Sequence, residues 1–297
     1  MRTAVARRGA TGFAQRLHAA GVRSGGLSVQ QFSSSSQQRK PTILDGYEGL
    51  VQYANRCTER VTQFERYEHD GVFDPSKFRF SNFLLYAKLQ IPANTEIDAV
   101  DFLNGAQFAC DLAMNTMYSR EFINFAIGAI KESRAAETLK QGLSSECYEA
   151  FLYAMTESSK SGNTFDLKQL DIDGVYLTGV EWDRLTLAEY KAEQGVADIS
   201  ARDPVANNGD GEQQIQSDAE EQAQKLAAAT PEINPADYNT FVERMFLDVL
   251  FKTKEHLDVT TAEGQDQSIV RDSSAVWRFE SLVTHSDDID WKIVNVS

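Results

Sequence analysis

Side chains that could carry out chemistry are few in this sequence and lie far apart. The three cysteines have neither disulfide nor metal-ligand spacing: they are Cys57, Cys110 and Cys147. The four histidines are scattered in the same way: they are His18, His69, His256 and His285. No Gly-x-Ser-x-Gly elbow, phosphate-binding Gly-Lys loop or His-Glu-x-x-His helix occurs. We therefore expect a protein that is not an enzyme, with no catalytic residues, no cofactor and no metal site.

Three polar positions remain as candidates, and each has a simpler interpretation. The run Asp171-Ile172-Asp173-Gly174 resembles the start of a calcium loop, but the later ligand positions are missing, so we expect a plain turn. The pair Asp287-Asp288 is expected to be solvated in a tight turn. His256 follows a predicted strand and is expected to lie on the surface rather than to act as a base in a cavity.

A stretch of aromatic and basic residues offers a different kind of site. Between residues 77 and 88 the chain has three bases, four aromatic residues and no acid: these are Lys77, Phe78, Arg79, Phe80, Phe83, Tyr86 and Lys88. In one interpretation the aromatic rings enter a lipid headgroup region while the bases meet anionic lipid. In the other, the rings pack on the domain's own helices and the bases only extend past them into water. The sequence leaves both open.

The first forty residues indicate where the protein works. Residues 1–40 contain seven bases and no acid, with many serines and an amphipathic arrangement, which is typical of a mitochondrial transit peptide. A basic tail that binds nucleic acid or membrane is the alternative. The full chain carries a formal charge of −15 and these residues +7, which leaves −22 for the remainder. Phosphate backbones repel so acidic a body, so we do not expect broad nucleic-acid binding.

The elements that would position these residues are helices first. Apolar residues at helical spacing predict an amphipathic helix over residues 41–67, within an N-terminal region, residues 41–94, that contacts the membrane if the first interpretation holds. The domain that follows, residues 95–297, is predicted to begin with a helix near Thr95, where Thr95 and Asp98 form a capping-box-like pair. Two more helices are predicted over about 121–141 and 145–157.

Strands follow the helices. Alternating residues predict strands over about 175–182, 245–252, 275–283 and 289–296, the first of them after a turn at Asp173-Gly174. Residues 201–237 hold eight acids, two bases and few large apolar residues, so we expect a disordered insertion there. Helices followed by antiparallel strands predict an α+β fold, with helices packed on a curved antiparallel sheet whose concave side can enclose an apolar cavity.

Three stretches resemble one known family. They are Asp101-Phe102-Leu103-Asn104-Gly105-Ala106, residues 137–151, and Val276-Trp277-Arg278-Phe279-Glu280 with Asp290-Trp291-Lys292-Ile293. The family is the Tim-forty-four-like domain. It forms the C-terminal domain of the motor scaffold in the mitochondrial inner-membrane translocase and occurs in the membrane-tethering protein of the mitochondrial large ribosomal subunit. The resemblance runs from about Asp98 to Ser297, with Ser281 where the family usually has arginine.

The resemblance implies a fold and a membrane contact. The fold is a roll of the cystatin-like, nuclear-transport-factor-two-like kind, and the family contacts the matrix face of the inner membrane through helices just before the domain. The residues that the resemblance places in the structural core are Phe102, Gly105, Trp277, Phe279 and Trp291. The alternation of Trp277 and Phe279 with charged residues independently predicts a buried hydrophobic layer of the sheet.

Three functions remain open from the sequence. The first is a non-catalytic adaptor peripheral to the matrix face of the mitochondrial inner membrane, of the protein-import kind, whose partners are proteins of an inner-membrane assembly and anionic lipid. The second is an accessory subunit of a respiratory complex or of the ATP synthase, where an acidic body suits protein-only contacts. The third is a tether of the mitochondrial large ribosomal subunit, whose RNA suits an acidic body less well.

Overall fold

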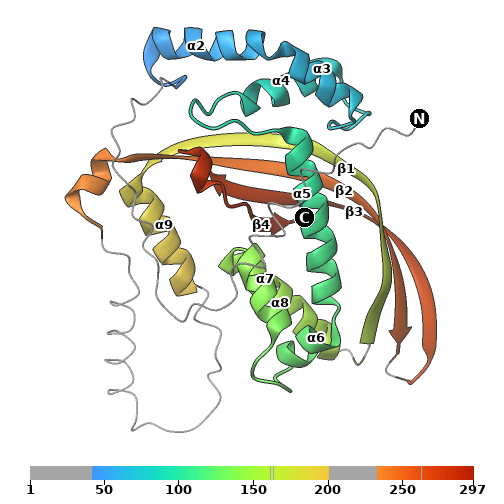
Figure 1. Cartoon of the computed structure of the whole chain (residues 1–297). Coiled ribbons are helices and arrows are strands. Elements are labelled where there is room, and N and C mark those ends of the chain that lie inside the picture. Colours follow the sequence, from blue (N-terminus) through green and yellow to red (C-terminus); the bar gives the residue numbers. More distant parts are fainter. Residues whose placement is uncertain (1–41, 161, 163, 201–232, 262) are drawn as a thin grey trace, which may run out of the picture.

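Four antiparallel strands and a set of helices make up the part of the chain that the computed structural model describes, residues 42–160, 162, 164–200, 233–261 and 263–297. The strands form one sheet in sequence order: they are β1 (Thr164–Thr186), β2 (Phe241–Thr260), β3 (Asp266–Leu282) and β4 (Lys292–Val296). The sheet curves around helix α5 (Ala99–Met117), as Figure 1 shows. The prediction of an α+β fold, with helices packed on a curved antiparallel sheet, is confirmed.

The helices lie in two groups on this sheet. The N-terminal group covers one end of it: it contains α2 (Gly46–Glu59), α3 (Val61–His69) and α4 (Arg79–Leu89). The second group follows α5 and consists of α6 (Arg120–Ala126), α7 (Arg134–Gly142) and α8 (Ser145–Lys160). In the described residues no helix combines the length and the apolar character that crossing a bilayer requires.

The core lies between these helices and the odd-numbered residues of β2. Met245, Leu247, Val249 and Phe251 are all buried, while the residues between them are only half-buried. Strand β3 has the same alternation, so Trp277 and Phe279 lie opposite Val249 and Leu247 and are also buried. This is the period-2 pattern of a sheet with one covered face.

Helix α9 (Leu187–Ser200) packs on the opposite face of the sheet and was not predicted. Its first residues bury Leu187 against Leu185 and Val242, and Val242 belongs to the even-numbered face of β2. The predicted insertion begins just after this helix, and residues 201–232 of it lie outside the described residues, as does the predicted leader, residues 1–40.

The prediction that the disordered insertion extends to residue 237 is wrong at its C-terminal end. Residues Pro235–Asn239 form a 3-10 helix, η1, and its Asp237 is buried. The Asp237 carboxylate accepts a hydrogen bond of 2.7 Å from the Nζ of Lys191 and one of 2.9 Å from the backbone N–H of Asn234. The contact with Lys191 ties the acid to α9, and the contact with Asn234 holds the start of η1, so residues 233–237 pack on the domain.

Two of the predicted helices are each divided into two helices in the structure. The helix expected over residues 41–67 breaks at Arg60, which ends α2 and precedes α3. Phe64 and Tyr67 of α3 are buried, whereas Val51 of α2 is exposed. The helix expected over about 121–141 is α6 and α7, because Gly128 has a positive φ of 75° and the Ser133 hydroxyl caps α7 by accepting from the N–H of Ala136.

The start of α5 also differs from the predicted capping pair. Asp98 itself is the N-cap, because its Oδ1 accepts a 2.9 Å hydrogen bond from the N–H of Val100. Thr95 is buried and serves another purpose, since its hydroxyl donates to the carbonyl of Val283 at 2.8 Å. This bond joins the segment before α5 to the end of β3.

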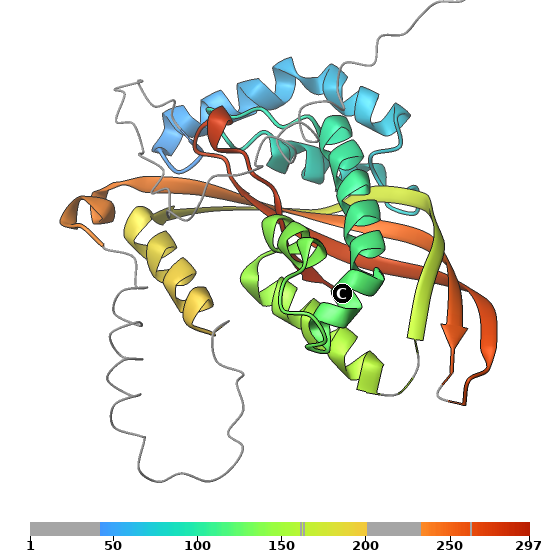
Figure 2. The ribbon, with the colours of Figure 1, turned by 60° about the horizontal axis from the view of Figure 1, so that its bottom comes forward.

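Strands β1, β2 and β3 are longer than the alternation predicted, whereas β4 begins only at Lys292 and is shorter than the predicted strand over 289–296. Asp173 and Gly174 lie inside β1, where the pairing with β2 shifts register, so they do not form the predicted turn. The far halves of β1, β2 and β3 extend beyond the helices as a curved three-stranded arm, which we define as residues 164–174, 253–260 and 263–274 (Figure 2). His256 lies within β2 on this arm rather than after a strand, with its Nε2 3.2 Å from Asp171.

Candidate functional site

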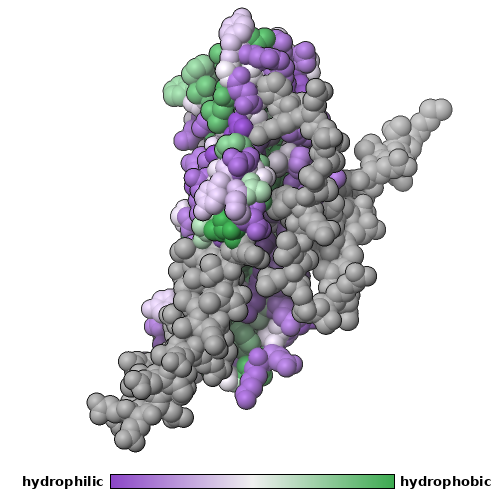
Figure 3. Space-filling model, turned by 90° about the vertical axis from the view of Figure 1, so that its left-hand side faces the viewer, coloured by the Kyte–Doolittle hydropathy of each residue, from purple (hydrophilic) through white to green (hydrophobic). Residues whose placement is uncertain are grey.

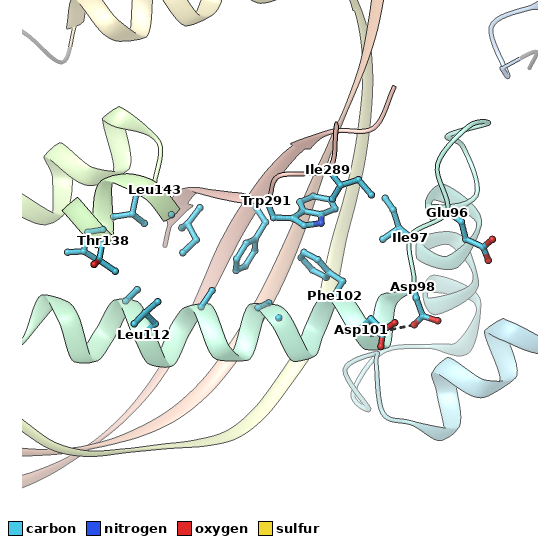
Figure 4. Close-up of a pocket in the computed structure, with 18 residues that line it drawn as sticks. Glu96, Ile97, Asp98, Asp101, Phe102, Leu112, Thr138, Leu143, Ile289 and Trp291 are labelled. Carbon is cyan, nitrogen blue, oxygen red and sulfur yellow. Dashed lines mark hydrogen bonds between the residues drawn. The ribbon is translucent and has the colours of Figure 1, made fainter. Parts of the chain in front are cut away.

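A cavity of about 370 Å³ opens between α5, α7 and the C-terminal end of the sheet. Figure 4 shows its side chains converging from the three elements, with carboxylates at one end only. Helix α5 supplies one wall, Thr138 of α7 and Leu143 just after α7 close the far end, and the segment from Ile289 to Ile293 supplies the side next to the sheet. A volume of this size holds a small apolar ligand or a few apolar side chains of a partner.

Small residues at helical spacing make room for the cavity. Gly105, Ala106, Ala109 and Ala113 lie on one side of α5 and all line the space. A Cβ added at Gly105 would meet no atom within 4 Å. Larger side chains at these positions would fill the space that separates α5 from α7.

An aromatic cluster forms the floor of the cavity. The ring of Phe102 lies 5.5 Å from that of Phe279, edge to face, and 4.8 Å from that of Trp291. Four of the five residues that the family resemblance placed in the core therefore lie together here, since Gly105 lines the same space. The fifth, Trp277, does not line it and packs on Phe251 with ring centroids 5.4 Å apart.

The charged residues at the cavity mouth stabilise the fold. Glu96 pairs with Arg60 at 3.2 Å, and Asp98, which caps α5, pairs with Arg66. These two ion pairs join the mouth to α3 and to the residue before it. Asp101 is the third acid of this rim and is exposed. The deeper lining is hydrocarbon apart from the Thr138 hydroxyl and the Trp291 indole, so it is suited to binding apolar groups rather than to proton transfer.

The aromatic and basic stretch divides into an inner and an outer half. Tyr86 is fully buried and its hydroxyl donates to the carbonyl of Cys57 at 3.0 Å, and burial raises its pKa to about 12. Phe83 packs edge to face on Phe64, with ring centroids 5.4 Å apart. In contrast, Phe78 and Phe80 are 83% and 70% exposed. Core packing therefore accounts for Phe83 and Tyr86 only.

The three bases of this stretch are exposed but not equivalent. Arg79 pairs with Glu68 at 2.9 Å and its guanidinium lies 5.7 Å from the ring centroid of Phe64. Its charge is thus neutralised within the protein. Lys77 and Lys88 are exposed at the two ends of the stretch and flank the outer rings.

Helix α2 carries a second group of exposed apolar residues. Its outer side carries exposed Tyr47, Leu50 and Val51, and Leu44 precedes it. The inner side holds α2 against α4, because the Tyr53 hydroxyl donates to the carbonyl of Ala87 at 3.0 Å. Figure 3 shows hydrophobic residues beside hydrophilic ones at the upper end of the molecule, where α2 begins. We call the exposed set the outer apolar surface: it comprises Leu44, Tyr47, Leu50, Val51, Phe78, Phe80 and Leu84.

The remaining candidates of the sequence lie away from the cavity. Asp171 and His256 pair on the strand arm, and hydrogen bonding from the Gln169 side chain, then from His256, lowers the pKa of Asp171. Asp287 and Asp288 lie in the short 3-10 helix η2 (Ser286–Asp288). In the parts of the chain that the structure describes, no cluster of three potential metal ligands occurs. The buried thiols of Cys110 and Cys147 have pKa values raised by burial to about 12 and about 11.

The geometry defines an α+β domain with an apolar cavity and an outer apolar surface. No protein-family model matches this chain, and no curated protein matches it. Among solved structures it is similar to the crystal structure of the intermembrane space region of the chloroplast protein ARC6, with 13% identity and a TM-score of 0.24 over 65% of this chain and 94% of that one. A similarity at this level carries no argument about function.

Proposed function

We propose that this protein is a non-catalytic adaptor peripheral to the matrix face of the mitochondrial inner membrane, of the protein-import kind. The observation that carries the proposal is the outer apolar surface, with exposed Lys77 next to Phe78 in the sequence and exposed Lys88 in the last turn of α4. An amphipathic helix whose apolar stripe faces water is suited to lie in a headgroup region, where nearby bases meet anionic lipid. The acid-free leader and the resemblance to the Tim-forty-four-like domain support the mitochondrial and import parts of the proposal.

The membrane contact has a direct test on anionic vesicles that contain cardiolipin. Each base near anionic lipid contributes on the order of 1 kcal/mol, and each phenylalanine that enters the interface contributes roughly 1.5–3 kcal/mol. We expect Lys77→Glu with Lys88→Glu, and separately Phe78→Ser with Phe80→Ser, to release the protein from the vesicles in a flotation assay. Arg79 is left unchanged because Glu68 already neutralises it.

Matched controls lie on the opposite side of the molecule. Tyr153 is an exposed aromatic residue of α8, and Lys131 is an exposed base between α6 and α7. These helices lie at the other end of the molecule from α2 (Figure 1). Tyr153→Ser and Lys131→Glu should leave vesicle binding unchanged. If the variant with both Phe78→Ser and Phe80→Ser floats with the vesicles as the wild type does, the proposed membrane contact is wrong.

The assembly to which the adaptor belongs has a separate test. Gentle detergent extraction of mitochondria, followed by identification of the proteins that co-migrate with this chain, separates a translocase from a respiratory complex and from a ribosome by size. Co-migration with a respiratory complex or the ATP synthase would favour the accessory-subunit function, which the −22 charge of the chain beyond residue 40 also suits.

A further inference from the structure

The strand arm ends in an edge that the described residues leave uncovered. β4 pairs with β3 only from Trp277 to Glu280, and the backbone of Val276 exchanges hydrogen bonds of 2.8 and 3.0 Å with Ser297. From Asp266 to Ser274, β3 pairs with β2 on one side and with no strand of the described chain on the other. This uncovered stretch is about 30 Å long.

The direction of its backbone groups follows from the pairing at Val276. In an antiparallel ladder the N–H and C=O of one residue point to the same side, and the side alternates along the strand. Val276 points toward β4, and the β2–β3 register has no shift. The N–H and C=O groups of alternate residues before it therefore point out from the free edge: these residues are Ser268, Val270, Asp272 and Ser274.

The other edge of the sheet is protected and this one is not. β1 has register shifts at three places along its pairing with β2, and Leu177 of β1 donates from its N–H to the carbonyl of Val72 at 2.8 Å. Bulges and covering loops are the devices by which proteins block edge-to-edge pairing. The free stretch of β3 has neither a bulge nor a proline.

The free edge is also held in place. The buried carboxylate of Glu255 on β2 pairs with Arg271 on β3, and Arg271 donates to the hydroxyl of Tyr118 at 3.2 Å. This contact fixes the middle of the arm to the end of α5. A strand that is already ordered lowers the entropic cost of pairing with another chain.

The charge of the arm indicates what kind of strand fits it. The arm carries eight acids and three bases, a formal charge of −5: the acids are Asp166, Asp171, Asp173, Glu255, Asp258, Glu263, Asp266 and Asp272, and the bases Lys168, Lys254 and Arg271. A second copy of the arm would bring the same negative charge and be repelled. Next to the edge, Val270 is 60% exposed and Ile269 39%, so an added strand would cover an apolar side chain on each face.

We propose that the β3 edge from Asp266 to Ser274 binds an extended, cationic segment of a partner protein by adding it as a further strand of the sheet. Main-chain hydrogen bonds to the four outward-pointing residues provide the affinity, and alternate side chains of the segment meet Val270 and Ile269. The proposal does not depend on the membrane contact, because the arm lies at the other end of the molecule from α2.

The test uses the full chain and a synthetic peptide of about ten residues in which lysine alternates with valine or threonine. The decisive comparison is the same peptide with every backbone nitrogen methylated, which keeps its charge and removes its main-chain donors on both sides. We expect calorimetry to detect binding of the first peptide and no binding of the methylated one. A peptide with glutamate in place of lysine should not bind either.

The substitution Val270→Pro blocks the edge by changing the protein instead of the peptide. The N–H of Val270 points outward, so a proline there breaks no bond of the β2–β3 ladder, and edge strands tolerate proline. We expect binding to weaken about tenfold or more, equivalent to about 1.4 kcal/mol or more, whereas Val270→Thr keeps the edge open and should bind as the wild type does. Glu263→Gln with Asp272→Asn should weaken binding and reduce its dependence on salt.

Several results would overturn the proposal. They are equal binding of the methylated peptide, unchanged binding by Val270→Pro, and absence of binding by the wild type. Self-association of the wild type that Val270→Pro abolishes would assign the edge to a second copy and would refute a cationic partner. If Val270→Pro does not fold, the methylated peptide with the wild-type chain still decides the question.

Discussion

Replacing Trp277 by alanine separates a structural role of the aromatic face from a binding role. Trp277 is only 3% exposed, lies opposite Val249 on β2 and packs on Phe251. It does not line the cavity, so the side chain has no surface to offer to a ligand. Truncation leaves a hole in the core, which costs roughly 3–5 kcal/mol for tryptophan or phenylalanine.

That cost is large beside the stability of a typical domain, about 5–15 kcal/mol. For a chain of this size it corresponds to a drop in melting temperature of about 6–20 °C. The measurement is urea and thermal unfolding followed by circular dichroism. The denaturant slope should not change, because the variant exposes the same surface on unfolding.

A control isolates the effect of burial from that of removing an aromatic ring. Tyr153 of α8 is 68% exposed, and Tyr153→Ala should change the free energy of unfolding by less than about 0.5 kcal/mol. The reasoning is refuted if Trp277→Ala melts within a degree or two of the wild type. Loss of vesicle binding in a fully stable Trp277→Ala protein would also refute the reasoning, because it would show that the buried face has a binding role.

Three other substitutions and one sequencing experiment have defined outcomes. Gly105→Ala should stabilise the protein by about 0.5–1 kcal/mol, because Gly105 lies inside α5 with open space around it; a lower melting temperature would contradict this. Thr95→Val should cost about 1–3 kcal/mol by removing the bond to Val283, and an unchanged urea midpoint would count against it. Hydrogen bonding from Lys191, then from Asn234, lowers the pKa of Asp237, so the deficit of Asp237→Asn should be present at neutral pH and shrink as pH falls below about 4; a pH-independent deficit in thermal melts would disprove this. N-terminal sequencing of the mitochondrial protein should find a start between about residues 25 and 41, not Met1.

The predictable part of the sheet is the part that the helices cover. Met245, Leu247, Val249 and Phe251 are buried against helices and alternate with less buried residues, so the pattern identified this half of β2. The half from Thr253 onward was missed because much of it is polar, and its strands are held by pairing with neighbours that the alternation of one strand does not specify.

The cavity could not be predicted in the same way. Gly105, Ala106 and Ala109 indicate only that one side of α5 has small side chains. Whether a neighbour fills that side depends on where α7 and the Ile289–Ile293 segment pack, and these contacts join residues far apart in the sequence. Small residues at helical spacing next to the Phe102 aromatic were the one available signal.

The N-terminal helices share the core of the domain, so their orientation relative to the sheet is fixed. Phe64 and Tyr67 each pack on Tyr86 and on Phe73, and Phe73 forms a bridge with Leu177 of β1. Arg184 of β1 pairs with Asp45 just before α2. The N-terminal helices are therefore part of the rigid domain and are not joined to it by a flexible linker. Any surface that held the outer side of α2 would therefore also fix where the free edge of β3 lies relative to that contact, because no hinge separates the two.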